Sequence, residues 1–330
     1  MKAIIFDGKE FQLIEKETPI PEGRDILVKI KAISVNPIDT KVKKMIEGTE
    51  TLKILGWDAS GIVEAIGENV KNFKVGDEVF YAGDITRDGS YATHQLVDEC
   101  IVGFKPKNLS FEESAALPLT SIAAWEALFD RLNIDPEKDK SKRILIIGGA
   151  GGVGSIAIQL AKKVAGLKVI ATASRDESKN WCRSLGADGV LDHRKDLREE
   201  MDQLKIKNFD YILCLNNTDQ YFSKMSEIIK PQGKICSLVS TEKEHDLDIL
   251  KKKSVTFVWE FMFTRSMFNT DDVIEQSKLL NKLSDLLDAG IIKTTKTSVE
   301  SNLNIENLNL VHQLIESGKS IGKIVLSTVE

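Results

Sequence analysis

The chain has 330 residues, of which 42% are hydrophobic and 29% are charged, and its formal charge is −5 at pH 7. These values are ordinary for a globular protein of about two domains, and they argue against a basic surface for nucleic acid or anionic membranes. The amino-terminal segment lacks a signal-peptide pattern, no stretch approaches the ~18 apolar residues of a membrane span, and the four cysteines form no CxxC pair. We therefore expect a cytoplasmic protein with free thiols that binds neither membrane nor nucleic acid.

The first third of the chain has the alternating pattern of a β-rich domain. Apolar and polar residues alternate in six short segments separated by Gly, Pro or Asp turn signals, at 1–6, 11–17, 26–35, 61–67, 77–83 and 93–99. A helical region follows at 111–132, where apolar residues recur at every third or fourth position. Because Pro118 interrupts this pattern, we expect a break there and a new helix from about Thr120 to Leu132.

From Lys142 onward, predicted strands and helices alternate. The strands lie at 143–147, 168–174, 189–192, 209–215, 234–240 and 254–260, and the helices at 155–165, 176–186, 197–205 and 220–229. Such alternation indicates a doubly wound parallel sheet, and hence an α/β fold. An amphipathic helix at about 272–289, a helix near 307–317 and a final strand at 323–327 complete the pattern.

The loop after the first of these strands carries the motif of a dinucleotide site. Six residues fit G-x-G-x-x-G, namely Gly149, Ala150, Gly151, Gly152, Val153 and Gly154. The motif follows a strand and opens a helix, which is the setting that makes it specific. The first glycine permits a tight turn, the second lets the backbone approach the pyrophosphate, and the third lets helix and strand pack closely. The free N–H groups of the helix would face the phosphates.

The end of the second strand predicts which nucleotide binds. An NAD enzyme usually has Asp or Glu there, whereas this chain has Ala173, Ser174 and Arg175. Hydroxyl and guanidinium groups are the donors that a 2′-phosphate needs, and Lys179 could assist them. The pattern favours NADPH over NADH, and the alternative is that Arg175 is an ordinary surface residue.

Taken together, motifs along the whole chain resemble the medium-chain dehydrogenase/reductase superfamily. They lie at 35–41 (VNPIDTK), 56–67 (GWDASGIVEAIG), 75–83, 115–129, 148–162, 185–188 and 322–326. Within that superfamily the chain is similar to the quinone oxidoreductase branch. Its segment 259–268 (WEFMFTRSMF) and its strand end TASR resemble the subgroup labelled zinc-type alcohol dehydrogenase-like.

The resemblance implies two domains and a dimer. A GroES-like β-rich catalytic domain would comprise residues 1–119, completed by 262–330, and a doubly wound parallel Rossmann domain at 120–261 would bind NADP(H). Nicotinamide and substrate would meet in the cleft between the domains. Relatives dimerise through the terminal strand of the Rossmann sheet, which is 254–260 here, so we expect a homodimer.

The chain departs from its zinc-dependent relatives at the metal site. Where they have a cysteine ligand, this chain has the segment from Asn36 to Asp39, and where they have Gly-His-Glu it has Gly56-Trp57-Asp58. The cysteine-rich lobe that binds their structural zinc is also absent. Because a zinc site needs three or four Cys, His or carboxylate ligands, we expect no metal.

Residue-by-residue comparison also implies a substrate side of the site. Asn36 would lie near the nicotinamide, and Trp57, Tyr81, Phe261 and Phe263 could form an apolar slot for a planar acceptor. Tyr81 is the one proton donor that the comparison offers, although packing within a strand explains this residue equally well.

On the cofactor side, Thr120 would lie near the nicotinamide. Asn216 follows a predicted strand end, where cofactors bind, and His193 matches a position that contacts the adenosine phosphate in relatives. Lys323, in the final GKIVL segment, is a further candidate. An ordinary loop or surface role is the alternative for these last three residues.

Three functions fit this pattern. Without a metal ion to polarise an alcohol, acceptors that take hydride directly fit best. The first hypothesis is a zinc-independent, NADPH-dependent oxidoreductase that transfers hydride to a quinone. The second is an NADPH-dependent reductase of α,β-unsaturated carbonyls, which must also deliver a proton to carbon. The third is a non-catalytic NADPH-binding redox sensor.

Overall fold

The computed structural model describes residues 1–300 and 302–328. The chain divides into two compact units. Unit 1 combines Met1–Ile122 with Met262–Glu330, and unit 2 is Ala123–Phe261. The two ends of the chain thus belong to one unit, and the middle of the chain forms the other.

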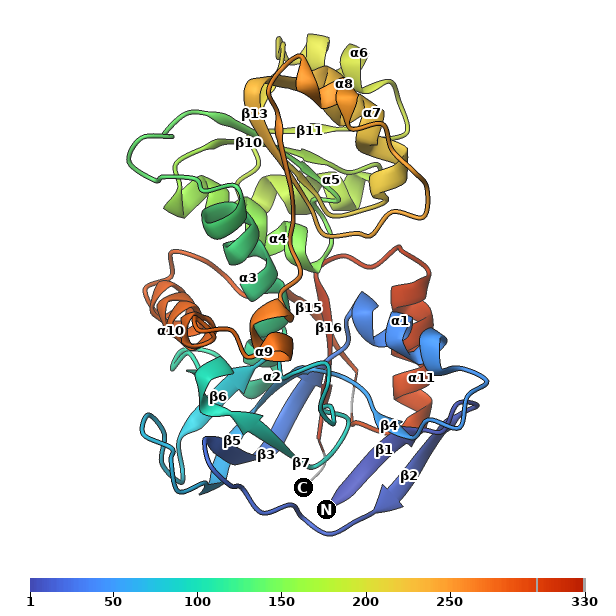
Figure 1. Ribbon diagram of the computed structural model, residues 1–330, viewed down its shortest axis with the longest axis vertical. Coiled ribbons are helices and arrows are strands. Elements are labelled where there is room, and N and C mark those ends of the chain that lie inside the picture. Colours follow the sequence, from blue (N-terminus) through green and yellow to red (C-terminus); the bar gives the residue numbers. More distant parts are fainter. Residues whose placement is uncertain (301, 329–330) are drawn as a thin grey trace. The chain divides into compact units, whose positions relative to one another are not determined.

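Unit 1 is built on a seven-stranded, mostly antiparallel sheet (Figure 1). Six strands follow the order β15-β16-β3-β5-β6-β8, and β7 pairs with β3. Their bounds are Lys296–Glu300 (β15), Lys323–Ser327 (β16), Asp25–Ser34 (β3), Asp58–Ile66 (β5), Glu78–Tyr81 (β6), Val102–Phe104 (β8) and His94–Asp98 (β7). A three-stranded sheet has the order β2-β1-β4, with bounds Phe11–Glu15, Lys2–Phe6 and Lys53–Ile54. The β-rich first third is therefore confirmed.

The last strand explains why both chain ends share a unit. In β16, Val325 pairs with Ser34 of β3, and Leu326 pairs with Ile33. These residues are all fully buried. The final strand therefore completes a sheet that begins near the amino terminus.

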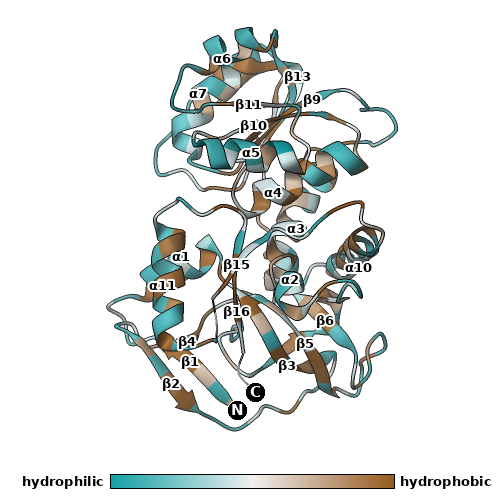
Figure 2. Cartoon of the chain, turned by 180° about the vertical axis from the view of Figure 1, so that it is seen from behind, coloured by the Kyte–Doolittle hydropathy of each residue, from teal (hydrophilic) through white to brown (hydrophobic). Residues whose placement is uncertain are grey.

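The helices of unit 1 surround these sheets. Their bounds are Pro37–Ile46 (α1), Phe111–Ala115 (α2), Pro118–Trp125 (α3), Thr264–Phe268 (α9), Ile274–Asp288 (α10) and Ile305–Glu316 (α11), with a short 3₁₀ turn η1 at Glu99–Ile101. Helix α10 packs against β8 and η1, and its apolar and polar residues are both visible in Figure 2. The amphipathic helix expected at about 272–289 is therefore present.

The expected break at Pro118 is confirmed. Helix α2 ends at Ala115 and a new helix, α3, begins with Pro118 as its first residue, two residues earlier than predicted. Proline is well tolerated at this position because the first N–H groups of a helix have no intrahelical partner. The α-helix ends at Trp125 and continues as a π-helical turn, η2 (Glu126–Arg131), in which the Leu132 amide bonds to the Ala127 carbonyl.

Unit 2 is a doubly wound parallel sheet with the order β11-β10-β9-β12-β13-β14. The strand bounds are Gly189–Leu191, Lys168–Thr172, Arg143–Ile147, Phe209–Cys214, Ile229–Ser237 and Thr256–Trp259. The helices are Gly152–Gln159 (α4, continuing as the π-turn η3 at Leu160–Val164), Asp176–Leu185 (α5), Leu197–Gln203 (α6), Thr218–Ile228 (α7) and Asp248–Lys251 (α8). This order is that of a Rossmann domain, so the predicted fold class is confirmed.

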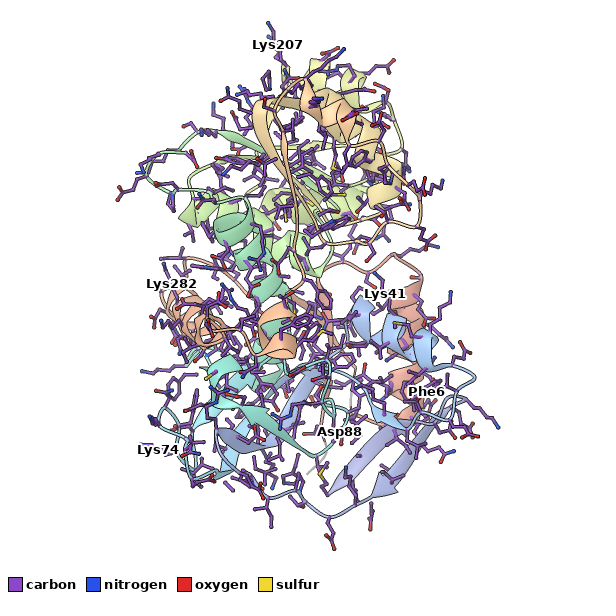
Figure 3. All side chains as sticks on the ribbon, viewed as in Figure 1. Phe6, Lys41, Lys74, Asp88, Lys207 and Lys282 are labelled. Atoms are coloured by element: carbon purple, nitrogen blue, oxygen red, sulfur yellow. The ribbon has the colours of Figure 1, made fainter. Side chains whose placement is uncertain are left out.

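Several long charged side chains extend from the surface, and the thiols are buried. Figure 3 shows the long side chains of Lys41, Lys74, Lys207 and Lys282, all of which are exposed. All four cysteines are free and buried, as expected. Among the helices of the described residues, none combines the length and apolar character needed to cross a membrane.

Candidate functional site

The glycine loop of unit 2 lies between β9 and α4. Gly148, one residue before the motif, has a φ of +86°, so the left-handed turn occurs there. This corrects the expectation that Gly149 makes the turn. Gly149 is needed for packing, because a Cβ on it would lie 2.7 Å from the Cβ of Ala171. A Cβ on Gly154 would lie only 2.4 Å from the Gly148 carbonyl oxygen. Because glycine has no Cβ, helix and loop approach closely here, as expected of the third glycine.

The second motif glycine faces open space. A Cβ on Gly151 would meet only the Gly148 carbonyl oxygen, at 3.6 Å. Gly151 is also the N-cap of α4, and Ala150, Gly152 and Val153 are each partly exposed. A helix start with accessible N–H groups beside an open glycine is a cradle that fits a pyrophosphate.

A cluster of charged groups surrounds the end of β10. Lys179 Nζ lies 3.0 Å from Asp192 Oδ2, and Arg194 binds both oxygens of Asp192 through Nε (3.0 Å) and NH2 (2.7 Å). The Arg194 NH2 group also donates to the Ser174 carbonyl oxygen over 2.8 Å. Hydrogen bonds from Arg194 hold the pKa of Asp192 well below its usual range despite burial. Ser174, Arg175 and Lys179 therefore lie in one region, with Arg194 as a neighbour that the sequence did not suggest.

Two further residues that could bind the cofactor lie at strand ends of the same sheet. His193 directly follows Asp192 and is partly buried, and burial lowers its pKa. Asn216 is exposed after β12, and a Cβ on Gly148 would lie 3.5 Å from the Cβ of Asn216. Asn216 therefore borders the glycine loop.

In unit 1, Asn36 lies in a buried, hydrogen-bonded cluster. Its amide nitrogen donates to Asp58 Oδ2 over 2.8 Å, and its amide oxygen accepts from Lys323 Nζ over 2.5 Å. The ammonium group also donates to the Val35 carbonyl oxygen over 2.9 Å and lies 3.2 Å from Asp58 Oδ2. Asn36, Asp58 and Lys323 are at most 3% exposed. Lys323, which the sequence suggested as a cofactor-binding residue, therefore contacts Asn36.

Asp58 joins this cluster to the start of α3. Its Oδ1 atom accepts from the Leu119 amide over 2.7 Å. Burial raises the pKa of Asp58 and lowers that of Lys323. We assign both as charged, because the two groups are in contact and every proton of the ammonium has an acceptor.

A second arm of hydrogen bonds leads away from Asn36. Asp39 Oδ2 accepts from the backbone N–H of Asn36 over 2.8 Å and from the Tyr91 hydroxyl over 3.2 Å. The Tyr91 oxygen lies 2.9 Å from His312 Nε2. Asp39 is part of the VNPIDTK motif, so the sequence offered a signal for it. Tyr91 and His312 are 221 residues apart, and no local pattern links them.

Two members of the predicted aromatic slot are in contact within unit 1. Trp57 and Phe263 pack edge to face with ring centroids 5.8 Å apart, and both are fully buried. Trp57 Nε1 donates to the Asp84 carbonyl oxygen over 3.0 Å. Phe261 belongs to unit 2 and is 42% exposed.

Tyr81 and Thr120 are both buried in unit 1. The Tyr81 hydroxyl has no hydrogen-bond partner among the described residues, and burial raises its pKa. The Thr120 hydroxyl donates to the Leu117 carbonyl oxygen over 3.1 Å. Both residues are at most 2% exposed.

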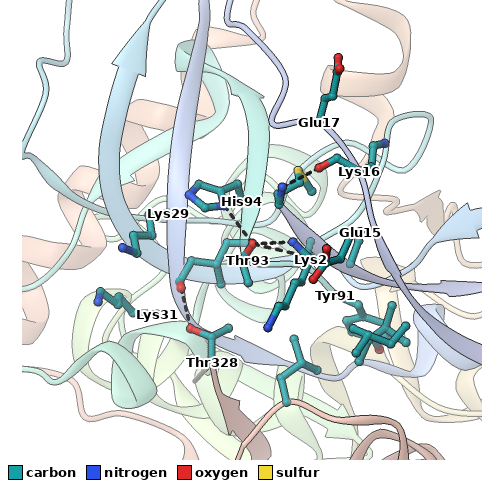
Figure 4. A pocket seen from close by; sticks show the side chains of 17 residues that line it. Lys2, Glu15, Lys16, Glu17, Lys29, Lys31, Tyr91, Thr93, His94 and Thr328 are labelled. Atoms are coloured by element: carbon teal, nitrogen blue, oxygen red, sulfur yellow. Dashed lines mark hydrogen bonds between the residues drawn. The ribbon is translucent and has the colours of Figure 1, made fainter. Parts of the chain in front are cut away.

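Unit 1 also has a cavity of about 1050 Å³ (Figure 4). Its polar lining includes Lys16, which pairs with Asp88, and Lys29 and His94, which both contact Glu64. Tyr91 also lines this cavity, and its hydroxyl bonds to Asp39 and His312. The cavity therefore borders the second arm of the cluster.

The described residues contain no group of three or more His, Cys, Asp or Glu side chains that could bind a metal ion. In the Asn36 cluster, the oxygens of Val35, Asn36 and Asp58 already bind the ammonium of Lys323. The Lys323 ammonium thus occupies the place between these three oxygens.

The chain matches two family models. Residues 22–122 match the alcohol dehydrogenase GroES-like domain, and residues 152–282 match the zinc-binding dehydrogenase model. A zinc-type alcohol dehydrogenase-like protein of Staphylococcus aureus is 47% identical over 323 residues, which cover 97% of this chain and 96% of the relative. The crystal structure of a putative zinc-dependent alcohol dehydrogenase from Rhizobium etli is 45% identical, with a TM-score of 0.95 over 100% of this chain and 98% of that one.

Other similar proteins have more specific names. The 2-methylene-furan-3-one reductase of Solanum lycopersicum is 30% identical over 96% of this chain and 75% of its own length. The NADPH-dependent alkenal/one oxidoreductase of Arabidopsis thaliana is 34% identical over 72% of this chain and 62% of its own length. The quinone oxidoreductase of Coxiella burnetii is 26% identical, with a TM-score of 0.79 over 100% and 99% of the two chains. The Escherichia coli quinone oxidoreductase in complex with NADPH, at 24% identity, 99% and 100% coverage and a TM-score of 0.83, shows the shared fold.

Proposed function

The chain belongs to the medium-chain dehydrogenase/reductase superfamily, and we propose that within it the protein is a zinc-independent, NADPH-dependent reductase that transfers hydride to a quinone. The observation that carries this proposal is the combination of an open glycine cradle with hydroxyl and guanidinium donors at the end of β10. The cradle supports binding of a dinucleotide, and the donors support a 2′-phosphate.

The residues of unit 2 fit NADPH. Backbone N–H groups of Gly151, Gly152 and Val153 would bind the pyrophosphate, and Ser174 and Arg175 would bind the 2′-phosphate. Lys179 adds positive charge, although it is already paired with Asp192. When bound, NADPH supplies the hydride from C4 of its nicotinamide.

In unit 1, the oxygens of Val35, Asn36 and Asp58 bind the Lys323 ammonium. This arrangement supports acceptors that need no Lewis acid. Quinones and enones take hydride directly, because the carbonyl conjugated to the accepting atom stabilises the resulting anion. The chain's part is to orient the acceptor and exclude water. Quinone reduction is supported by the neighbour from Coxiella burnetii.

Enone reduction is a second candidate that a specific observation favours. The two relatives named as reductases of a methylene-furanone and of alkenals are more similar in sequence than the quinone oxidoreductases. Tyr81→Phe separates the two candidates if Tyr81 donates the proton to carbon. Enone turnover should then fall far more than quinone turnover, whereas equal losses would remove the distinction.

The direct test is NADPH oxidation by purified, chelator-treated protein. The acceptors are 9,10-phenanthrenequinone and a 2-alkenal in parallel, with NADH as the control donor. Turnover that prefers NADPH and survives chelation is the expected result. Activity that is lost with the metal would overturn the metal-free proposal, and tight NADPH binding without turnover of either acceptor would favour the redox sensor.

A further inference from the structure

Three buried side chains beside Asn36 form a continuous hydrogen-bonded chain. It runs from Asp39 in α1, through the Tyr91 hydroxyl, to His312 in α11, with contacts of 3.2 Å and 2.9 Å. Each of the three residues is at most 1% exposed. Phe11 packs edge-on against the His312 ring with centroids 5.2 Å apart. The chain of polar groups is therefore enclosed by unit 1.

The atom at each end of this hydrogen-bonded chain lacks a partner. Asp39 Oδ1 and His312 Nδ1 are buried and have no hydrogen-bond partner within the described part of the protein. All the atoms between them are bonded, namely Asp39 Oδ2, the Tyr91 hydroxyl and His312 Nε2. A buried polar atom without a partner costs about 1–3 kcal/mol, so two such atoms at the ends of one chain call for a functional explanation.

The charges around the chain leave Asp39 able to hold a proton. Lys323 and Asp58 face Asp39 together with Tyr91, but the three protons of Lys323 go to Val35, Asn36 and Asp58. Burial raises the pKa of Asp39 to about 7, although the charge of Lys323 acts in the opposite direction. At the other end, burial and the charge of Lys43 lower the pKa of His312 to about 3, so its ring is neutral.

We propose that His312, Tyr91 and Asp39 form a proton relay that delivers to the acceptor the proton accompanying the hydride. This inference rests on the proposed function, since it requires an acceptor bound beside Asn36. Imidazole, phenol and carboxyl groups each accept a proton while donating another, so the chain conducts without any side chain leaving its place. In this relay, Asp39 Oδ1 releases the proton and His312 Nδ1 takes one up, so both unpartnered atoms have a function.

Hydride addition leaves the acceptor as an anion, an enolate or a hydroquinone anion. The O–H bond at Asp39 Oδ1 breaks, the proton goes to that anion, and Asp39 becomes a carboxylate. The Tyr91 proton then moves to Asp39 Oδ2 while the Nε2 proton of His312 moves to the Tyr91 oxygen, and Nδ1 takes a proton that solvent supplies. Rotation of the Asp39 carboxyl and the Tyr91 hydroxyl in place, with exchange of the His312 tautomer, restores the starting arrangement. One solvent proton is consumed in each turnover.

The test uses two variants and two kinds of acceptor. Tyr91→Phe keeps the ring and removes the hydroxyl, and His312→Gln keeps a polar group that cannot exchange protons between two ring nitrogens. One acceptor needs a proton; it is a 2-alkenal or 9,10-phenanthrenequinone, whichever the wild type reduces. The other is an electron-poor quinone whose hydroquinone stays ionised at the assay pH, so that it needs none. Melting temperature and NADPH binding are measured for each variant to establish that it folds.

We expect kcat with the proton-requiring acceptor to fall about a hundredfold in either variant, the range typical of general acid catalysis, while kcat with the electron-poor quinone stays within about twofold. In the wild type, the first rate should fall as the pH rises through about 7, because Asp39 loses its proton. The matched control is Tyr211→Phe, which removes a hydroxyl bonded at 2.8 Å to the buried Asp139 in unit 2 and should change neither rate.

Two results would overturn the relay. Equal losses with both acceptors would show that the chain only supports the structure, and unchanged rates in both folded variants would show that it carries no proton. Because the two variants are independent, one that fails to fold leaves the other to decide. If the wild type turns over neither kind of acceptor, the proposed function fails and the relay fails with it.

Discussion

Lys323 Nζ lies 2.5 Å from Asn36 Oδ1, although 287 residues separate them in the sequence. The pairing of β16 with β3 places Lys323 beside the start of α1. Because Lys323 and Asp58 bind opposite ends of the Asn36 amide, the orientation of that amide is fixed before any ligand arrives. The buried ion pair of Lys323 and Asp58 thus determines which face of Asn36 is available to a ligand.

Removing the Lys323 charge should destabilise unit 1 strongly. We expect Lys323→Met to lower the free energy of unfolding by about 3–5 kcal/mol, because Asp58 is left as a buried charge without its cation. Urea unfolding measures this value. The double variant Lys323→Met/Asp58→Asn should recover part of the loss, and two fully additive losses would contradict the ion pair.

Arg175 should discriminate between the two nicotinamide nucleotides. A charge-assisted bond to a 2′-phosphate contributes about 1.5–3 kcal/mol, so Arg175→Ala should raise the Kd of NADPH about tenfold or more and leave that of NADH unchanged. Titration calorimetry measures both constants. Arg183→Ala, an exposed arginine on the same helix α5, is the control. Equal weakening of NADPH and NADH would argue against the assignment.

A pair of buried glutamates in unit 2 should make stability depend on pH. Glu260 and Glu126 are at most 2% exposed, and Arg131 Nε lies 2.7 Å from Glu260. Burial, aided by the charge of Glu126, raises the pKa of Glu260 well above its ordinary value of 4.5. At pH values between the pKa of the unfolded chain and that of the folded protein, the folded protein holds a proton that the unfolded chain has released. The free energy of unfolding should therefore fall as the pH rises, by at most ~1.4 kcal/mol per pH unit.

Glu260→Gln should remove this dependence, because the amide stays neutral and has a similar shape. Urea unfolding from pH 6 to 9 compares the variant with the wild type. The exposed Glu177→Gln serves as the control, since it should leave the wild-type slope intact. Parallel slopes for wild type and Glu260→Gln would show that another group is responsible.

The terminal strand of unit 2 should mediate a homodimer. β14 (Thr256–Trp259) pairs with β13 at one edge of the sheet, and Trp259 is 47% exposed. An open edge with an exposed tryptophan favours pairing with a second copy. We expect light scattering at micromolar concentration to give twice the protomer mass, and Trp259→Lys to reduce it. Leu13→Lys, an exposed leucine of unit 1, should leave the mass unchanged.

The sequence predicted local features well and long-range contacts poorly. The strand-helix alternation and the glycine motif are local patterns, and both lie where expected. Gly148 was missed as the turn residue because the motif describes which glycines are present and does not give their backbone angles. The Asn36–Asp58–Lys323 cluster requires contacts between β5, β16 and α1, which no periodicity reveals.

The burial of single side chains was equally hard to predict. Tyr81 and Trp57 are aromatic residues in a region that the family resemblance places near substrate, yet both are fully buried within unit 1. The environment of Trp57 depends on Phe263, a residue from the other end of the chain. Arg194 lies next to His193, but its contact with the Ser174 carbonyl requires two neighbouring strand ends to be in place.

The pairing of β16 with β3 also sets an order of events during synthesis on the ribosome. Unit 2 is one continuous segment and can fold as soon as it emerges, since domains fold as units during translation. The Ala32–Ser34 end of β3 must wait for residues 325–327 to be translated, and until then it presents an unpaired edge. The nascent protein should therefore depend on chaperones until β16 is made, and a premature stop codon just before β16 should yield an insoluble product, because this end of β3 then stays without its partner strand.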